Sequence, residues 1–173
     1  GAEVFTSARR RAGPATPVDV AGLLRSAVED PDPVLFLEHK KTYRKISGLV
    51  PEGQWRVPIG VADVVRPGDD MTIVTYGLHR HLSLEAAEVL AAEDYSVEVI
   101  DLRTLAPLDD AAIVATVKKT NRVMILHEDT RTGGIAGEIT ARISESCFEW
   151  LDAPVLRVTA HDVPLPYAPA WED

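Results

Sequence analysis

The side chains best suited to chemistry are His127, Glu128 and Asp129, which directly follow the apolar run 123–126. An imidazole beside two carboxylates supplies a base and two acids, a combination that serves proton transfer or metal ligation. Open α/β sheets bind their ligands at the carboxyl ends of their strands, where this group is expected to lie. The sequence shows no second complete set of ligands, so we expect no metal site, and a structural or interface role is the alternative.

Two more histidines, His79 and His81, follow an apolar run that ends at Tyr76 and Gly77. Residues two apart do not share a helix face, so one of them is expected to face the sheet edge and the other solvent. Solvated or interfacial histidines are the alternative.

Further on, the stretch 101–103 joins an aspartate to an arginine, and we expect a local ion pair that stabilises a turn.

Gly133 and Gly134 begin a predicted helix, and Thr130 and Thr132 precede them. The backbone N–H groups at such a helix start could bind an anion. The sequence contains neither a G-x-G-x-x-G fingerprint nor a P-loop, so no nucleotide site is predicted. Turn geometry or close helix packing is the alternative explanation of the two glycines.

Cys147 is the only cysteine, which excludes an internal disulfide framework and a multi-cysteine zinc site. Ser144 and Ser146 lie near it, but all three fall deep inside a predicted helix. That position suits neither a nucleophile elbow nor a Cys–His pair. We therefore predict that Cys147 is a buried core residue.

The elements that must position these residues alternate regularly after residue 70. Nearly unbroken apolar strands separated by amphipathic helices predict an α/β fold, a mostly parallel sheet with helices on both faces. We expect strands at 71–76, 97–100, 123–126 and 155–159, and helices at 79–93, 109–119 and 133–151. The inner faces of the first and last helices are expected to carry Leu82, Ala86, Val89 and Leu90, and Ile135, Ile139, Ile143, Cys147 and Trp150.

The N-terminal third has a different character. Thr16, Pro17 and Asp19 form a capping pattern that predicts a helix, which ends at Asp30-Pro31 and is followed by a strand at 34–37. Residues 1–13 lack periodicity and are expected to be irregular. A basic segment rich in proline and glycine, 39–69, reads as a connector. The proline-rich end from Pro164 is expected to lack regular structure.

Composition narrows the function classes. The chain has 173 residues, 46% of them apolar, and a net charge of −9. An acidic protein is a poor match for nucleic acid or an anionic membrane surface, because both need a basic face. No apolar run approaches the ~18 residues of a membrane span, and the start does not resemble a signal peptide. With its single cysteine, the chain is expected in a reducing cytoplasm.

Several stretches taken together resemble one known family. They are PVLFLEHK at 33–40, VPIG at 57–60, DMTIVTYG at 70–77, VIDLRTL at 99–105, His127-Glu128 with Thr132-Gly133-Gly134, DAP at 152–154 through RVT at 157–159, and DVPLPYA at 162–168. The resemblance is to the beta subunit of the thiamine-diphosphate-dependent decarboxylase component of 2-oxo acid dehydrogenase complexes. It covers about residues 14–173 in order.

This resemblance implies a domain organisation. Residues 66–173 look like the transketolase C-terminal domain, a three-layer α/β fold. Residues 14–40 look like the last helix and strand of a pyrimidine-binding domain, and 41–65 like the linker, with 1–13 unassigned. Most of the pyrimidine-binding domain is not in this sequence.

The resemblance also implies a function. The complete enzyme decarboxylates a 2-oxo acid oxidatively with thiamine diphosphate and magnesium and passes the acyl group to lipoyl. A branched-chain substrate of the 2-oxoisovalerate type is favoured, with pyruvate as the alternative. The implied partners are an alpha subunit and a second beta subunit in a heterotetramer, and a lipoyl-bearing acyltransferase. No cofactor ligand falls in this segment, which is expected to be inactive alone.

Within such an enzyme this segment would supply subunit interfaces and line the entrance used by the lipoyl arm. His81, His127 and Glu128 are the candidates for that entrance. Two alternatives stay open. The segment could be a non-catalytic assembly module, or an unrelated doubly wound domain that binds a phosphorylated ligand at Gly133 and Gly134.

Overall fold

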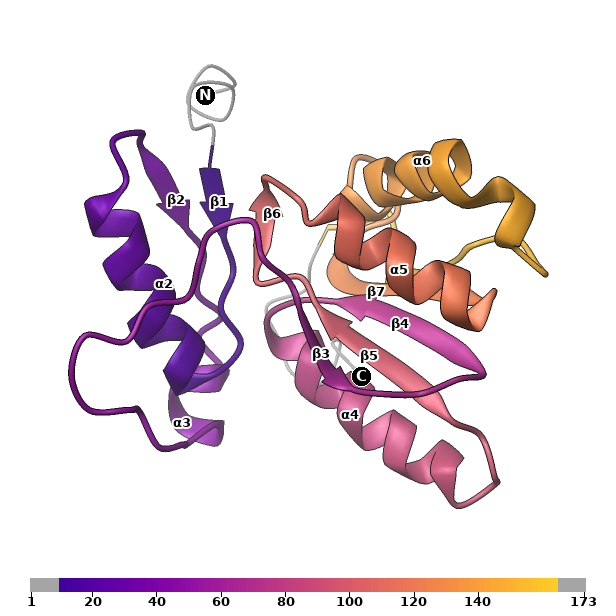
Figure 1. Cartoon of the computed structure of the whole chain (residues 1–173), viewed down its shortest axis with the longest axis horizontal. Coiled ribbons are helices and arrows are strands. Elements are labelled where there is room, and N and C mark those ends of the chain that lie inside the picture. The colour runs from indigo at the N-terminus through magenta and orange to yellow at the C-terminus, as the bar shows by residue number, and fades with distance from the viewer. Residues whose placement is uncertain (1–9, 165–173) are drawn as a thin grey trace.

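The computed structural model describes residues 10–164, which form two units side by side (Figure 1). The larger unit is built on a five-stranded sheet and the smaller one on a three-stranded sheet. The strands are β1 (Arg10–Ala12), β2 (Val34–Phe36), β3 (Asp63–Arg66), β4 (Met71–Thr75), β5 (Val97–Asp101), β6 (Thr104–Ala106), β7 (Val123–Thr130) and β8 (Leu156–Ala160). The helices are α2 (Pro17–Glu29), α3 (Thr42–Lys45), α4 (Leu78–Ala91), α5 (Asp110–Thr120) and α6 (Ile135–Cys147), with a 3-10 turn at Phe148–Trp150.

The larger sheet has the strand order β3-β5-β4-β7-β8. Its last four strands are parallel, and β3 pairs antiparallel with β5 at one edge. All five residues of β5 are buried, as expected of a strand covered on both faces. The predicted mostly parallel α/β sheet is therefore confirmed, and the carboxyl ends of β4, β5, β7 and β8 meet at one edge.

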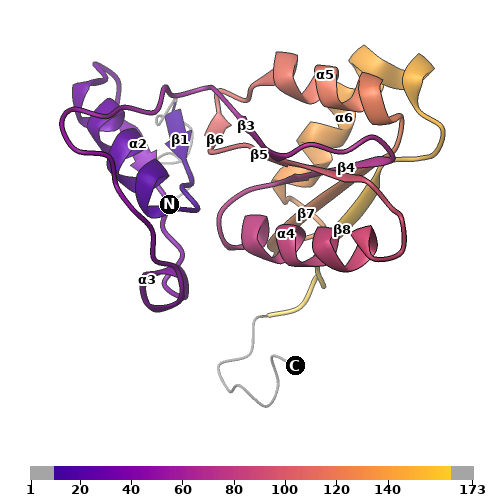
Figure 2. The same ribbon diagram turned by 60° about the horizontal axis from the view of Figure 1, so that its bottom comes forward.

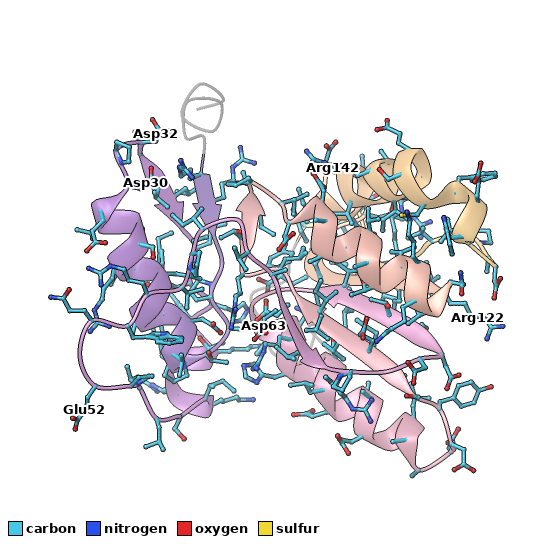
Figure 3. All side chains as sticks on the ribbon, in the orientation of Figure 1. Asp30, Asp32, Glu52, Asp63, Arg122 and Arg142 are labelled. Atoms are coloured by element: carbon cyan, nitrogen blue, oxygen red, sulfur yellow. The ribbon has the colours of Figure 1, made fainter. Side chains whose placement is uncertain are left out.

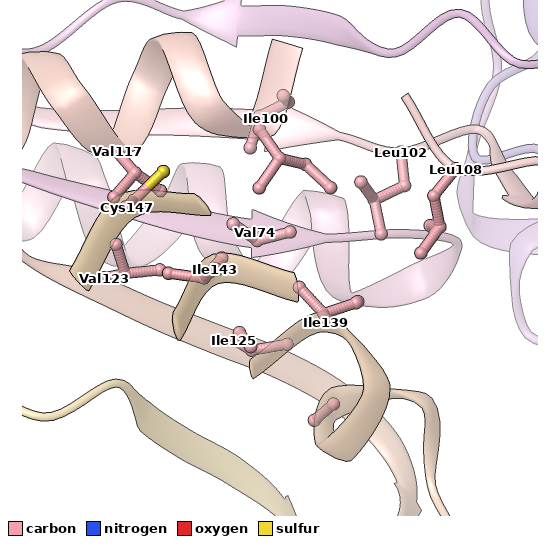
Figure 4. Packing of buried hydrophobic residues seen from close by; sticks show 12 residues of the cluster. Val74, Ile100, Leu102, Leu108, Val117, Val123, Ile125, Ile139, Ile143 and Cys147 are labelled. Carbon is pink, nitrogen blue, oxygen red and sulfur yellow. The ribbon is translucent and has the colours of Figure 1, made fainter. Parts of the chain in front are cut away.

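Helices cover both faces of this sheet (Figure 2). Helices α5 and α6 lie on one face, where a cluster of buried aliphatic residues forms the main core (Figure 4). Helix α4 lies on the other face over a smaller cluster that contains Ile73, Ala87, Val97 and Val99. Alternate residues of each strand serve the two clusters, because side chains alternate across a pleated sheet.

The observed ends of helix α5 agree with the predicted ones because local side chains cap them. The Asp109 side chain accepts a hydrogen bond from the Ala112 N–H at 3.0 Å and so caps the helix start. Asn121 ends the helix in the left-handed conformation (φ 60°), which asparagine tolerates well. Lys118 and Lys119 lie in the last turn, where positive charge favours the helix dipole.

The predicted inner face of α4 is wrong for three of its four residues. Leu82 and Val89 are 44% and 65% exposed and Ala86 is exposed as well, while Ser83 and Ala87 are buried. The buried Ser83 hydroxyl donates to the His79 carbonyl, which satisfies its hydrogen bond inside the helix. Small residues let α4 approach the sheet closely; Leu84 and Leu90 pack beside them partly buried, and Leu82 and Val89 are left on the outside.

In α6 the predicted buried stripe is confirmed for Ile139, Ile143 and Cys147. It is wrong for Trp150, which is 47% exposed. The α-helix ends at Cys147, and the 3-10 turn that follows changes the direction of the side chains. Trp150 instead packs under the Lys118 ammonium, which lies 5.3 Å from the ring centroid.

The smaller unit contains the predicted N-terminal helix. Thr16 accepts a hydrogen bond from the Asp19 N–H and Pro17 occupies the first turn of α2, as the sequence indicated. The expectation that 1–13 is irregular is wrong for Arg10–Ala12, which is the middle strand of the β2-β1-β6 sheet. A three-residue strand with two arginines is too short to show a period of two.

The connector holds two short elements, α3 and β3, within its proline- and glycine-rich sequence. Strand β3 completes the edge of the larger sheet, and the chain then turns tightly at Gly68 into β4. A Cβ atom on Gly68 would lie 2.2 Å from the Val97 carbonyl carbon and 2.3 Å from the Glu98 nitrogen. Only glycine therefore allows this backbone to cross the start of β5.

The expected local ion pair between Asp101 and Arg103 is wrong. The Asp101 carboxylate accepts a hydrogen bond from the Arg103 backbone N–H at 3.1 Å, and the Arg103 side chain points elsewhere. Its guanidinium lies 2.9 Å from Asp19 of α2 and 2.7 Å from Asp63 of β3. Asp63 lies where the two units face each other (Figure 3). Arg103 thus joins the two units.

Within residues 10–164, no helix has the length and apolar character needed to cross a membrane. The end beyond Pro164, expected to lack regular structure, lies outside the described residues.

Replacing Gly68 by alanine should lower the free energy of unfolding by about 1–3 kcal/mol, the usual cost of overpacking against atoms that cannot move. Gly137→Ala is the matched control, because a Cβ there would meet only the Arg157 side chain at 3.9 Å. That change in mid-helix should stabilise the protein by about 0.5–1 kcal/mol. Urea unfolding of both variants checks this; equal effects would contradict the close crossing at Gly68.

Candidate functional site

A cleft of about 990 Å³ lies between the two units, at the carboxyl edge of the larger sheet. The smaller unit contributes one wall through Gly13, Pro14 and 37–41. The other wall is formed by residues that follow β4 and the ends of β7 and β8. The polar side chains of its lining are Glu38, His39, Lys41, Tyr76, His79, Glu128, Asp129 and His161. Nothing in the spacing of these residues along the sequence brings them together; the fold does.

One hydrogen-bonded pair spans the cleft. His39 Nε2 lies 2.7 Å from Glu128 Oε2. His39 Nδ1 accepts the Lys41 N–H at 3.2 Å, so the ring proton is assigned to Nε2 and is donated to Glu128. The Glu128 side chain is 49% exposed, so the pair contributes less than about 1 kcal/mol to stability. Its weakness suits a contact that opens when a ligand enters.

Tyr76 and His79 line the floor of the cleft after β4. Burial, with the charges of Asp129 and Glu128, raises the pKa of Tyr76 to about 12, so its hydroxyl stays protonated. Burial lowers the pKa of His79; the Glu128 carboxylate opposes this and His39 adds to it. The floor therefore presents a neutral phenol and a neutral imidazole beside two carboxylates.

His127 lies beneath this floor and is only 1% exposed. Its Nδ1 faces the Asp129 N–H at 3.1 Å and its Nε2 faces the Ala136 N–H at 3.2 Å. Tyr76 stacks on the ring at 6.1 Å between centroids. Burial lowers the pKa of His127, opposed by Asp129 and supported by His79, and two facing N–H donors disfavour a second ring proton. His127 supports the site from behind and does not reach the cleft.

His81 also points away from the cleft lining. Its Nε2 lies 2.8 Å from the Ala15 carbonyl oxygen, so it ties α4 to the start of the smaller unit. Of the three candidates from the sequence, the structure places only Glu128 in the cleft wall. His39 and Tyr76 were missed, and His79 was expected only as one of two histidines that could face the sheet edge. The one available signal was that each follows the end of a strand.

The hydrogen-bond donors of Thr132 in the loop 130–134 are satisfied by another part of the chain. The Asp162 carboxylate accepts from the Thr132 N–H at 2.9 Å and from the Thr132 hydroxyl at 2.7 Å. These bonds lower the pKa of Asp162. At the start of α6 the Ala136 N–H is directed to His127, and a Cβ on Gly134 would lie 2.3 Å from the Thr130 oxygen. Gly134 therefore serves close packing, and Asp162 binds the Thr132 donors that precede it.

Among residues 10–164, no three His, Cys, Asp or Glu side chains are placed to hold a metal ion. The donors at the α6 start are also used within the chain, so these residues do not fit a magnesium-bound diphosphate. What the cleft offers is hydrogen bonding from neutral and anionic groups to a polar ligand. A smaller apolar cavity of about 260 Å³ adjoins it, and both cavities share Pro14, Glu38 and His39.

A parallel α/β sheet with an antiparallel edge strand, and a cleft at the carboxyl edge, defines the class of doubly wound ligand-binding domains. Residues 60–173 match the family "Transketolase, C-terminal domain". The chain belongs to this family.

The relatives of this chain are subunits of larger enzymes. It is 51% identical over 160 residues to the 2-oxoisovalerate dehydrogenase subunit beta of Bacillus subtilis, covering 92% of this chain and 49% of that protein. It is 46% identical to the pyruvate dehydrogenase E1 component subunit beta of the same organism, covering 91% and 48%. The chain thus spans about half the length of these curated relatives.

Two further similarities support the same fold. The beta subunit of acetoin:2,6-dichlorophenolindophenol oxidoreductase of Cupriavidus necator is 43% identical, covering 92% of this chain and 47% of that protein. A solved structure described as a split-gene transketolase, an inactive beta4 tetramer, superposes with a TM-score of 0.74 at 28% identity. It covers 89% of this chain and 49% of that one.

The surroundings of His127 lower its pKa, so we expect the ring to become protonated only at a pH below its usual pKa of 6.5. Asp129→Asn should lower the pKa further, because the charge of Asp129 favours the imidazolium. A nitrogen-15 NMR titration of the histidine rings checks both. A His127 pKa above 6.5, or a rise in Asp129→Asn, would contradict the described surroundings.

Proposed function

We propose that this chain is part of the beta subunit of a thiamine-diphosphate-dependent 2-oxo acid dehydrogenase, which decarboxylates the acid and passes the acyl group to lipoyl. The observation that carries this is the 51% identity over 92% of the chain with a 2-oxoisovalerate dehydrogenase subunit beta. The same observation favours a branched-chain substrate. Pyruvate is the alternative, since the identity to the pyruvate dehydrogenase subunit is 46%.

The cofactor of such an enzyme supplies the electron sink for decarboxylation. The described residues do not fit it. We propose that thiamine diphosphate and magnesium are held by the parts of the complete enzyme outside residues 10–164. By itself this chain would then be inactive.

We propose that the cleft receives the lipoyl arm of the acyltransferase. Glu128 and His79 would contact the arm, and Tyr76 with the His39–Glu128 pair would shape the entrance. His127 and His81 keep supporting roles: the first holds the turn at Asp129, and the second ties α4 to the smaller unit.

We propose that the exposed apolar residues make subunit contacts with an alpha subunit and a second beta subunit. Val28 of α2 is 78% exposed and Leu82 and Val89 of α4 are 44% and 65% exposed. Apolar surface of this kind often marks an interface.

The proposed compartment is the cytoplasm, on the basis of the single buried cysteine and the acidic composition.

The test is to isolate the native protein from its own host with an antibody to residues 66–173. The purified material should decarboxylate 3-methyl-2-oxobutanoate faster than pyruvate, only when thiamine diphosphate is added, and should contain an alpha-type subunit. The assembly-module alternative predicts a chain that co-purifies with other subunits but is dispensable for their activity. No thiamine-dependent decarboxylation in the isolate would refute the proposal.

If the cleft receives the lipoyl arm, substitutions in the cleft should slow acyl transfer to lipoyl in the complete enzyme but should not slow the reduction of a dye. Glu128→Gln and His79→Gln should each slow acyl transfer to a lipoyl domain about tenfold, the usual effect of one lost hydrogen bond to a charged or buried group. Reduction of a soluble dye by the same variants should not change, because a dye bypasses the lipoyl entrance.

Glu145→Gln, an exposed position on α6, is the matched control and should leave both rates unchanged. If both acceptors slow equally, the two residues act on the decarboxylation site and not on the entrance. If neither rate changes, the cleft has no part in acyl transfer.

A further inference from the structure

The contact between the two units is built from buried charge. Asp19 of α2, Asp63 of β3 and Asp101 of β5 meet the guanidinium groups of Arg80 and Arg103. The side chains of Asp19 and Asp101 are 3% and 0% exposed, and those of the two arginines less than one fifth. The Asp63 side chain is 42% exposed, so the buried part of the cluster consists of Asp19 and Asp101, which share the two guanidinium groups.

Asp101 is the carboxylate least well compensated. Arg80 Nε lies 3.4 Å from its Oδ2, which makes no hydrogen bond. Its Oδ1 accepts only the Arg103 backbone N–H. Across the sheet, Asp63 stands directly opposite Asp101 in the antiparallel pairing with β3, and Thr75 is its neighbour on β4. The Arg103 side chain is committed to Asp19 and Asp63.

We propose that this cluster is a proton-sensitive latch: one proton bound to Asp101 holds the smaller unit closed on the larger sheet, and its loss loosens the contact. The cleft lies on the other side of the same contact. The Gly13 N–H donates to the Arg103 carbonyl at 2.8 Å, and Gly13 lines the cleft. Loosening the latch therefore frees one wall of the cleft. This inference goes beyond the proposed function and does not depend on it.

The direction of the pH effect follows from the surroundings of Asp101. Burial raises its pKa to about 7, the Asp19 charge adds to this, and the Arg103 N–H and the two guanidinium groups oppose it. The closed state therefore holds a proton that the open, hydrated state releases between its usual pKa of 3.8 and about 7. Closure is strongest at the acid end of that range and weakens as the pH rises, then levels off above about 7.

Amide hydrogen exchange measured on the whole chain tests the latch. The reporters are the amides of the β1–β6 pairing and Gly13, and the reference amides are Val74 and Ile100 in the main core. After correction for intrinsic exchange, protection of the reporters should fall about tenfold more than that of the reference amides between about pH 5.5 and 7.5. Equal losses at both places would overturn the proposal.

The decisive variant is Asp101→Asn, which keeps the shape of the protonated carboxyl. Its reporter amides should show no excess loss with pH, and at about pH 7.5 they should be about tenfold better protected than in the unchanged protein. Asp94→Asn is the control: Asp94 is exposed, and asparagine tolerates its φ of 64°. It should keep the full pH dependence. An Asp101→Asn variant that keeps that dependence, or an Asp94→Asn variant that loses it, would refute the latch.

A second measurement needs no variant. The carboxyl carbon-13 NMR signal of Asp101 in the unchanged protein should titrate with a midpoint near 7. A midpoint near the usual 3.8 would overturn the proposal even if Asp101→Asn failed to fold.

Discussion

The Arg103 side chain is the contact on which the arrangement of this molecule depends. Its backbone leaves β5 with a positive φ of 55°, a conformation that costs free energy in a residue such as arginine, which has a Cβ and no side-chain group that compensates locally. That turn sends the guanidinium out of the larger sheet to Asp19 and Asp63, and it sends the next residues into β6, the outer strand of the smaller sheet. One backbone turn therefore supplies both the ion pairs and the strand pairing that join the units.

The cleft is a consequence of this junction. Because β1 pairs with β6, residues 13–14 and 37–41 are brought over the carboxyl edge of a sheet to which they do not belong. The histidine at position 39 can then reach Glu128 across the gap. A buried pair such as Arg103–Asp19 favours one defined geometry, whereas the exposed His39–Glu128 pair adds little stability and can give way. The units are held firmly at the back of the cleft and weakly at its mouth.

Much of the larger domain could be predicted from sequence, because its signals are local. The cap at Asp109 and the stripe of Ile139, Ile143 and Cys147 each depend on residues within a few turns of one another, as does the cap at Thr16 in the smaller unit. The predictions that were wrong concern residues whose structure depends on partners far away in the sequence. Strand β1 exists only because β2 and β6 flank it, and the Arg103 side chain leaves its neighbour Asp101 for two aspartates on other elements.

The residues of the candidate site also divide into those that could be predicted from local sequence and those that could not. Glu128 could be chosen from its place after the apolar run 123–126, although β7 continues through it to Thr130. His127, beside it, is turned inwards by two backbone N–H groups that no local pattern reveals. The apolar face of α4 was misassigned because the helix approaches the sheet through Ser83 and Ala87. Leu84 and Leu90 pack beside them partly buried, while Leu82 and Val89 remain exposed.

A double-mutant cycle on Arg103 and Asp19 tests most directly whether this junction holds the two units together. Arg103→Gln, Asp19→Asn and the double variant would be unfolded in urea beside the unchanged protein. The account predicts a coupling free energy of about 1–3 kcal/mol, with the double variant losing clearly less than the two single losses combined. Losses that add within about 0.5 kcal/mol would contradict it, and the joining of the units would then rest on strand pairing alone.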